Sequence, residues 1–364
     1  MKIHLASIAT TNFATYTQDN AQCANIVQTA VKKYTAVNVL KGNKKMYNVL
    51  VTSRELPGNA LRELKTKCNV TLLKTQPSKI QLLKLIADKD AVLGFERIDA
   101  DVIAAGKKLK VISNNAVGFD NIDIATATKH GIIVTNTPGV LSQTVAEHAF
   151  ALLMAVAHRI VEGDYLMRRS KYHGGRSVLS LGTELKGKTL GIVGLGRIGS
   201  VVAKIAMHGY GMKVVYYSEH RNKKAEQSGI QYLSFKQLLA QSDFISLHVP
   251  LTDKTRHLIG AKQLKQMKRS AFLINTSRGP VIDEKALVTA LKHKTIAGAG
   301  LDVFEFEPKL SLGLSKLFNV VLTPHIGSAT IEARTAMADL AIDNLWRALN
   351  GKKPKAIVNP EVLK

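Results

Sequence analysis

Short apolar runs alternate with amphipathic stretches along most of this chain. From residue 46 onward, the runs typical of buried strands are residues 47–51, 69–73, 91–93, 110–112 and 132–134. Stretches with helical periodicity lie among them, at residues 59–66, 78–87, 100–106 and 122–130. Buried strands that alternate with helices indicate a parallel sheet covered by helices. We therefore expect a first α/β domain with a doubly wound sheet.

The same alternation starts again at Thr189. Predicted strands occupy residues 189–193, 213–217, 244–249, 271–275, 298–303 and 320–323, and predicted helices occupy residues 235–240, 262–267 and 284–293. A second doubly wound parallel sheet follows from this pattern. The predicted fold class is therefore α/β, with two Rossmann-like domains.

Two longer helical patterns connect these halves. One, over residues 143–168, is apolar on nearly every face at residues 149–157, so we expect it to be buried between domains or subunits. The other, over residues 330–349, ends at Asn350-Gly351, as helices often do. Its expected place is back against the first domain.

The predicted domain boundaries follow from these two connections. We expect the chain to pass between domains near Thr144 and near Ser328. Residues 1–45 then form an N-terminal extension of no assigned role, residues 46–144 with 329–364 form a discontinuous substrate domain, and residues 145–328 form a dinucleotide-binding domain. An interdomain cleft is the expected meeting place of ligand and chemistry.

Charge changes this picture only slightly. The chain has 364 residues and a formal net charge of +24, which invites a nucleic-acid or membrane partner. The lysines are spread along the sequence without an aromatic-interleaved basic stripe, so we expect neither partner. No apolar stretch is long enough to span a bilayer, and Cys23 and Cys68 form no metal or disulfide pattern. These features favour a cytoplasmic protein without a metal site.

The most informative stretch is GIVGLGRIG, at residues 191–199. Gly194 permits a tight turn after the apolar strand, and Gly196 lets bare backbone approach a pyrophosphate. Gly199 lets the following helix pack closely on that strand. Arg197 adds a positive charge for the same phosphate. This strand, turn and helix predict a dinucleotide site.

The end of the next strand bears on the choice of cofactor. An acidic residue there accepts a hydrogen bond from the ribose 2′-OH of NAD, whereas an arginine accommodates the 2′-phosphate of NADP. Ser218 stands at the position of the acid and Arg221 follows it, although Glu219 lies between them. The sequence therefore favours NADP(H), with NAD(H) as the alternative.

Three strand ends of the second domain carry residues suited to reducing a 2-oxo acid: Arg278, Glu307 and His325. Ligands bind beyond the carboxyl ends of parallel strands, where these residues fall. Arg278 offers a fixed fork of donors for carboxylate and carbonyl oxygens. His325 can give a proton to the carbonyl oxygen as hydride arrives at the carbon, and Glu307 would favour the imidazolium.

A series of motifs resembles the D-isomer-specific 2-hydroxyacid dehydrogenase family, and within it the glyoxylate/hydroxypyruvate reductases. The motifs are NAVGFDNID (115–123), VTNTPGVL (134–141), TVAEH (144–148), GKTLGIVGLGRIG (187–199), HVPLT (248–252), LINTSRG (273–279), GLDVFEFEP (300–308) and TPHIGSAT (323–330). The resemblance extends over about residues 46–364. It implies that Arg278, Glu307 and His325 are the catalytic set, with His325 as the acid/base. It also implies that backbone groups of Val117 and Gly118 hold the substrate carboxylate together with Arg278.

The resemblance further implies a lining for the cofactor, which joins the turn and strand-end residues already described. The expected cofactor-binding residues are Thr144, Gly194, Gly196, Arg197, Ile198, Gly199, Ser218, Arg221, Pro250, Thr255, Thr276, Asp302, His325 and Gly327. The helix that starts at residue 143 resembles the dimerisation element of the family, so a homodimer is expected.

The expected function is NAD(P)H-dependent reduction of a small 2-oxo acid, such as glyoxylate or hydroxypyruvate, to the D-2-hydroxy acid. D-3-phosphoglycerate dehydrogenase is the alternative of the same class, and a basic surface would suit its phosphorylated substrate. A nucleotide-sensing scaffold similar to the C-terminal binding protein corepressors is the alternative from another class. The loop at residues 94–97 looks shorter than in the reductases, which leaves the preferred 2-oxo acid open.

Overall fold

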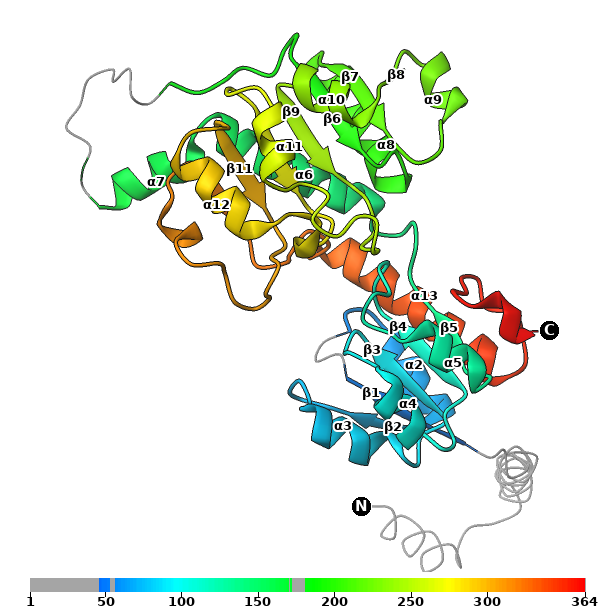
Figure 1. Cartoon of the computed structure of the whole chain (residues 1–364). Helices are drawn as coiled ribbons and strands as arrows, with labels where there is room; N and C mark the ends of the chain where they lie inside the picture. Colours follow the sequence, from blue (N-terminus) through cyan, green and yellow to red (C-terminus); the bar gives the residue numbers. More distant parts are fainter. Residues whose placement is uncertain (1–45, 53–55, 170, 172–180, 364) are drawn as a thin grey trace, which may run out of the picture. The chain divides into compact units, whose positions relative to one another are not determined.

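A computed structural model describes residues 46–52, 56–169, 171 and 181–363 (Figure 1). The first sheet contains β1 (Tyr47–Val51), β2 (Cys68–Leu72), β3 (Ala91–Gly94), β4 (Val111–Asn114) and β5 (Ile133–Thr135). Its helices are α2 (Ala60–Lys67), α3 (Lys79–Ile86), α4 (Ala100–Ala105) and α5 (Ile124–Lys129). All pairings are parallel, in the order β2-β1-β3-β4-β5. This is one of the common doubly wound orders.

The second sheet contains β6 (Thr189–Val193), β7 (Lys213–Tyr217), β8 (Gln231–Tyr232), β9 (Phe244–Leu247), β10 (Phe272–Asn275), β11 (Gly298–Leu301) and β12 (Val320–Leu322). Its helices are α8 (Arg197–Lys204), α9 (Lys223–Gln227), α10 (Phe235–Gln241), α11 (Ala261–Gln266) and α12 (Glu284–Lys292). Short helical turns are η2 (Ile205–Gly209), η3 (Gly279–Val281), η4 (Leu314–Lys316) and η5 (Pro360–Leu363). The parallel order β12-β11-β10-β9-β6-β7-β8 reverses beside β6, as in dinucleotide-binding sheets.

Both sheets have helices on both faces, which explains why their strands are continuously apolar. In the first sheet, Val49 and Val51 pack with α2 and α13 (Ile331–Leu349), whereas Leu50 between them packs with α3 and α4. In the second sheet, one face packs on α10, α11 and α12 and the other on α8 and α6 (Ser142–Ala157). The predicted fold class is confirmed on both sheets.

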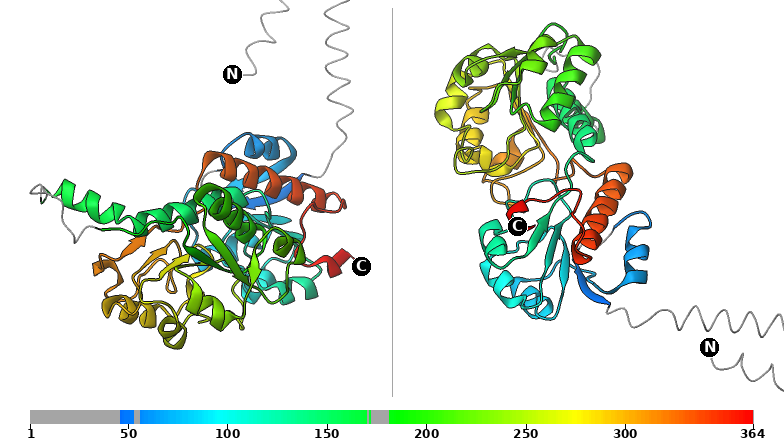
Figure 2. Two further views of the ribbon diagram at one scale, coloured as in Figure 1. Left: turned by 90° about the horizontal axis from the view of Figure 1, so that it is seen from above. Right: turned by 90° about the vertical axis from the view of Figure 1, so that its right-hand side faces the viewer.

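Helix α13 closes the first sheet from the far end of the sequence. Its side chains belong to the same buried cluster as β1 and β3, and Figures 1 and 2 show it in orange-red beside the blue and cyan strands. Tyr47 donates its hydroxyl to the carbonyl of Leu349 at 2.6 Å, and Ser113 donates to that of Ala341 at 2.8 Å. Residues more than two hundred positions apart thus form one core.

The single helix predicted over residues 143–168 is wrong, because the chain bends by 63° between α6 and α7 (Ile160–Arg168). Arg159 at the break has a left-handed backbone with φ of 56°, which ends the regular helix. The apolar stretch of α6 is buried, but it packs on the second sheet rather than between domains, and its expected place between subunits stays a prediction. In contrast, α7 has no buried residue.

Within the described ranges, no single helix has the length and apolar character needed to cross a membrane. Only α6 and α7 taken together meet that test, and they are bent at the break. The extension over residues 1–45 lies outside the described residues. The domain boundaries at residues 144 and 328 and the interdomain cleft stay predictions.

Candidate active site

The glycine turn after β6 has the geometry that its spacing predicts. Gly194 has φ of +96°, and a Cβ there would lie 2.6 Å from the carbonyl oxygen of His248. A Cβ on Gly199 would overlap the carbonyl oxygen of Gly194, so only glycine allows α8 to start this close to the turn. By contrast, nothing lies within 4 Å of the position of a Cβ on Gly196.

The first turn of α8 therefore has an open approach to its backbone. Its N-cap residue is Gly196, which has no side chain, so no N-cap side chain accepts a hydrogen bond from the first N–H groups of the helix. The first N–H groups of a helix have no partner inside the helix, and their dipole favours an anion. The residues of this turn therefore fit a dinucleotide pyrophosphate. Thr276, which follows β10 of the same sheet, has a buried hydroxyl with no hydrogen-bond partner among the described residues, and this hydroxyl is a further polar group for a ligand.

At the end of β7, the predicted cofactor residues Ser218 and Arg221 form hydrogen bonds with other residues of the protein. Ser218 accepts a hydrogen bond from the backbone N–H of Leu195 at 2.7 Å, which links this strand end to the glycine turn. Arg221 donates from Nε to Glu226 at 3.1 Å. Glu219 pairs with Lys254 at 2.9 Å, and that hydrogen bond and charge hold the pKa of the Glu219 carboxyl below its usual value. The positive charge of Lys254 thus partly offsets the negative charge of Glu219, which would otherwise repel a 2′-phosphate.

His325 and Glu307 form a pair at the ends of neighbouring strands. His325 follows β12, and its Nδ1 donates to Oε2 of Glu307 at 3.0 Å. The other oxygen of Glu307 accepts from the N–H of Phe304 at 2.9 Å. Burial acts to raise the pKa of Glu307, but the hydrogen bonds from His325 and Phe304, with the charges of His325 and Arg278, hold it below its usual value. Glu307 is therefore ionised at neutral pH.

The backbone around His325 is held by Asp302, which is buried at the end of β11. Its two carboxylate oxygens accept from the N–H groups of Ile326 at 2.8 Å and Gly327 at 2.7 Å. The carbonyl of Asp302 accepts from the N–H of His325 at 2.8 Å, and His325 has φ of 55°. This turn leaves the His325 side chain half exposed, and no described residue bonds to its Nε2. Nε2 is the nitrogen available to a reactant.

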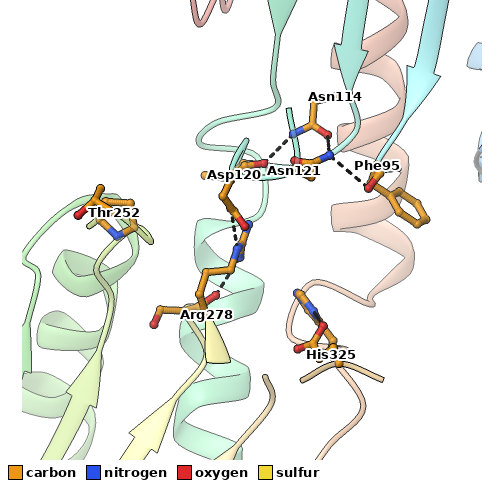
Figure 3. Close-up of polar contacts among 12 residues, drawn as sticks. Phe95, Asn114, Asp120, Asn121, Thr252, Arg278 and His325 are labelled. Atoms are coloured by element: carbon orange, nitrogen blue, oxygen red, sulfur yellow. Dashed lines mark hydrogen bonds and ion pairs between the residues drawn. The ribbon is translucent and has the colours of Figure 1, made fainter. Parts of the chain in front are cut away.

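Arg278 follows β10 and reaches toward the loop after β4 (Figure 3). Its Nε donates to Oδ1 of Asp120 at 2.9 Å, and its Nη1 donates to the carbonyl of Ser277 at 2.8 Å. A Cβ placed on Gly118 would overlap Nη2 of Arg278, so this nitrogen lies directly against the Gly118 backbone. Asn275 fixes the turn by accepting from Ser277 and donating to the carbonyl of Arg278 at 3.0 Å.

The loop with Val117 and Gly118 lies against this arginine. Asn136 donates its amide to the carbonyl of Val117 at 2.8 Å, and Asn114 donates to that of Gly118 at 2.6 Å. No hydrogen bond from the N–H of Val117 or Gly118 is made within the described part of the chain. Two unpaired N–H groups beside an arginine form a site with the chemistry to hold a carboxylate.

The remaining predicted cofactor residues lie on the loop after β9 and in the first turns of α6 and α8, where they also make structural contacts. Thr255 donates its hydroxyl to the carbonyl of Pro250 at 2.6 Å, which shapes the loop after β9. The hydroxyl of Thr144 lies 3.3 Å from that of Thr330, and Ile198 packs against a small buried cluster with Val145. Their contact with a cofactor, like that of Arg197, stays a prediction.

Sequence reasoning missed Asp120, Asn114 and Asn136 as parts of the site. Asp120 lies inside the motif NAVGFDNID, which was its available signal, but a single sequence does not pair it with a residue 158 positions away. The two asparagines act through their amides on backbone carbonyls, which no residue spacing reveals.

Comparison with known proteins agrees with this arrangement. Residues 150–327 match the family described as D-isomer specific 2-hydroxyacid dehydrogenase, NAD binding domain. Glyoxylate reductase of Thermococcus litoralis is 50% identical over 320 residues, covering 85% of this chain and 96% of that protein. Glyoxylate reductase of Korarchaeum cryptofilum is 48% identical over 87% of this chain and 97% of that protein.

Solved structures show the same likeness. A glyoxylate reductase from Paecilomyes thermophila has a TM-score of 0.79 and 32% identity, covering 87% of this chain and 99% of that one. An NADPH-dependent glyoxylate/hydroxypyruvate reductase from Sinorhizobium meliloti, in complex with NADP and malonate, has a TM-score of 0.77 and 30% identity over 86% of this chain and 97% of that one. Because half of the 320 aligned residues are identical to those of a glyoxylate reductase over nearly its whole length, the chain belongs to the D-isomer-specific 2-hydroxyacid dehydrogenase family.

Proposed function

We propose that this protein reduces a small 2-oxo acid, of the size of glyoxylate or hydroxypyruvate, to the D-2-hydroxy acid with NADPH or NADH. The observation that carries the proposal is the hydrogen bond between His325 and Glu307. Both residues follow strands of the second sheet, as does Arg278, which lies against Gly118. An acid, an anion-binding fork and an open glycine turn are the groups that this reaction requires. Family membership and the glyoxylate reductase relatives support it.

Each residue has a defined task in this proposal. The N–H groups of Val117 and Gly118 bind the substrate carboxylate, and Nη2 of Arg278 binds the carboxylate and the carbonyl oxygen. When bound, a nicotinamide dinucleotide supplies the hydride. His325 gives the proton from Nε2 to the carbonyl oxygen, and the ionised Glu307 keeps the ring oriented and favours its protonated form. In the reverse direction, His325 accepts the proton of the alcohol.

We propose NADP(H) as the preferred cofactor. Ser218 brings no negative charge to the end of β7, and Lys254 offsets the charge of Glu219. Arg221 lies at the same strand end, and a 2′-phosphate would compete with Glu226 for its guanidinium. An NADP-bound relative supports the same preference.

Oxidation of NADPH and, separately, NADH by the purified protein tests both proposals. The nicotinamide absorbance is followed with glyoxylate, hydroxypyruvate, pyruvate and 3-phosphohydroxypyruvate in turn. We expect turnover with glyoxylate or hydroxypyruvate and a higher kcat/KM with NADPH. Turnover with the phosphorylated acid alone would replace this function by that of a phosphoglycerate dehydrogenase. Tight dinucleotide binding with no turnover on any of the four would contradict reduction of a small 2-oxo acid and point to a bulkier 2-oxo acid or a scaffold role.

We also propose that the chain forms a homodimer in the cytoplasm. Helix α7 has no buried residue, and Ile160, Val161 and Met167 expose apolar side chains on it. Apolar groups clustered on one exposed helix favour contact with another protein surface. Light scattering should give twice the mass of the chain, and Ile160→Lys should shift the protein toward the monomer. A wild-type monomer at micromolar concentration would contradict this proposal.

A further inference from the structure

Two of the three guanidinium nitrogens of Arg278 donate hydrogen bonds to other groups of the protein. Nε donates to Asp120 and Nη1 donates to the carbonyl of Ser277. These two bonds fix the plane of the guanidinium, because Nε and Nη1 lie on different edges of the fork. The third nitrogen, Nη2, is the one against the backbone of Gly118. The orientation of Nη2 therefore depends on what holds the other two nitrogens.

Of those two partners, Asp120 is the one that comes from the other sheet. It follows β4 of the first sheet, whereas Ser277 precedes Arg278 on its own strand end. The carbonyl of Ser277 moves together with Arg278 because the two residues are adjacent in sequence. Asp120, by contrast, fixes the guanidinium relative to the loop that carries Gly118. The Asp120 carboxylate thus ties the guanidinium to the same loop that would hold the substrate.

The loop around Asp120 is itself held firmly (Figure 3). Asn121 donates its amide to the carbonyl of Phe95 at 3.2 Å and to Oδ1 of Asn114 at 3.3 Å. Asn114 is buried and donates to the carbonyl of Gly118 at 2.6 Å. Hydrogen bonds of the Asn114 and Asn121 side-chain amides therefore hold the backbone on both sides of Asp120. They limit the positions that the Asp120 carboxylate can take.

We propose that Asp120 is a positioning residue for Arg278: it holds the Nε edge of the guanidinium so that Nη2 faces the substrate site beside Gly118. The inference rests on the proposed function and names a residue to which that function gives no task. Asp120 touches no reacting atom and acts through Arg278. The side chains of Asp120 and Arg278 are 33% and 27% exposed. A partly exposed ion pair adds little to folding stability, so its loss should appear in kinetics rather than in Tm.

The test compares Asp120→Ala with Asp123→Ala, three residues further along the same motif. Asp123 makes no contact with Arg278 and instead caps α5 by accepting from the N–H of Thr126 at 2.9 Å. We expect Asp120→Ala to lower kcat/KM for glyoxylate by about 10- to 100-fold, as small misplacements of a binding group do. Its Tm and its Kd for NADPH should stay near those of the wild type. Asp123→Ala should do the reverse, with a lower Tm and an unchanged kcat/KM.

Two further variants distinguish a loss of guanidinium orientation from a non-specific effect of the substitution on the loop. Asp120→Asn keeps an oxygen that accepts from Nε, so its kcat/KM should stay within about fivefold of the wild type. In an Arg278→Lys background, which has no Nε–H to hold, Asp120→Ala should cost less than about twofold more. If Asp120→Ala does not fold, Asp120→Ser is used in its place with the same expectations.

The outcomes are distinct. Wild-type kinetics in Asp120→Ala, or a full additional loss in the Arg278→Lys background, overturns the role of Asp120 while leaving the proposed function in place. Equal losses in the Asp120 and Asp123 variants also overturn it. A wild-type protein that reduces none of the four 2-oxo acids overturns the proposed function, and the role of Asp120 with it.

Discussion

Replacing His325 with alanine is expected to slow reduction of glyoxylate by about a hundred- to ten-thousandfold, the range for losing a general acid. The variant keeps Arg278 and the glycine turn, so the Kd for NADPH and the KM for glyoxylate should change little. The loss should therefore appear in kcat. Steady-state kinetics followed at the nicotinamide absorbance, with dinucleotide binding measured by fluorescence, separates these quantities.

The chain offers a matched control for this variant. His257 is also a partly exposed histidine with a positive φ of 51°, and it pairs with Glu305 at 2.6 Å. It lies on the loop between β9 and α11 and has no task in the proposed reaction, so His257→Ala should keep kcat. Comparable losses in the two variants, or a near-normal kcat in His325→Ala, would rule out His325 as the acid.

Glu307→Gln tests the second half of the pair. Because the pKa of Glu307 is held low, its carboxylate is charged near neutral pH and favours the protonated ring beside it. Reduction needs that proton, so removing the carboxylate charge should lower kcat at neutral pH, while the Kd for NADPH stays unchanged. An unchanged kcat would show that Glu307 does not influence the proton of His325.

Replacing Arg278 with alanine is expected to lower kcat/KM for glyoxylate by about a hundred- to a thousandfold, as loss of one oxyanion donor does. The guanidinium binds both the substrate carboxylate and the carbonyl oxygen on which charge develops, so KM should rise and kcat should fall. Arg278→Lys keeps the charge but loses the fork, and we expect it to recover only part of the activity.

Arg269 supplies the control, since it is an exposed arginine just before β10, at the opposite end of the strand from Arg278. Arg269→Ala should leave the kinetics unchanged because ligands bind beyond the carboxyl ends of parallel strands. If Arg278→Ala kept its KM, or if Arg269→Ala lost as much activity, substrate binding by Arg278 would be excluded.

The sequence predicted the parts of the structure that depend on local patterns. Buried strands between helices are visible as apolar runs, and Gly194, Gly196 and Gly199 mark a turn whose steric demands the structure displays. The break at Arg159 was not predictable in this way, because the apolar pattern continues past it into α7. Strand β8 was missed since it has only two residues.

The candidate site was predictable in its residue types and in the pairing of Glu307 with His325, but not in its other pairings. Arg278, Glu307 and His325 each follow a strand, and parallel strands bring such ends to one edge. Which donor meets which acceptor depends on tertiary contacts, however. Arg221 bonds to Glu226 rather than standing clear for a phosphate, a pairing that the sequence analysis did not include.

The packing of α13 on the first sheet affects how this protein folds during synthesis. Strand β1 leaves the ribosome early, but the helix that buries one of its faces starts only at Ile331. At about 5–20 residues per second, that strand face waits on the order of tens of seconds for its cover. The second sheet, built from one continuous stretch that includes α6, can complete its core first. One apolar face of the first sheet therefore stays uncovered until the last part of the chain has been made, and a face exposed in this way is open to aggregation.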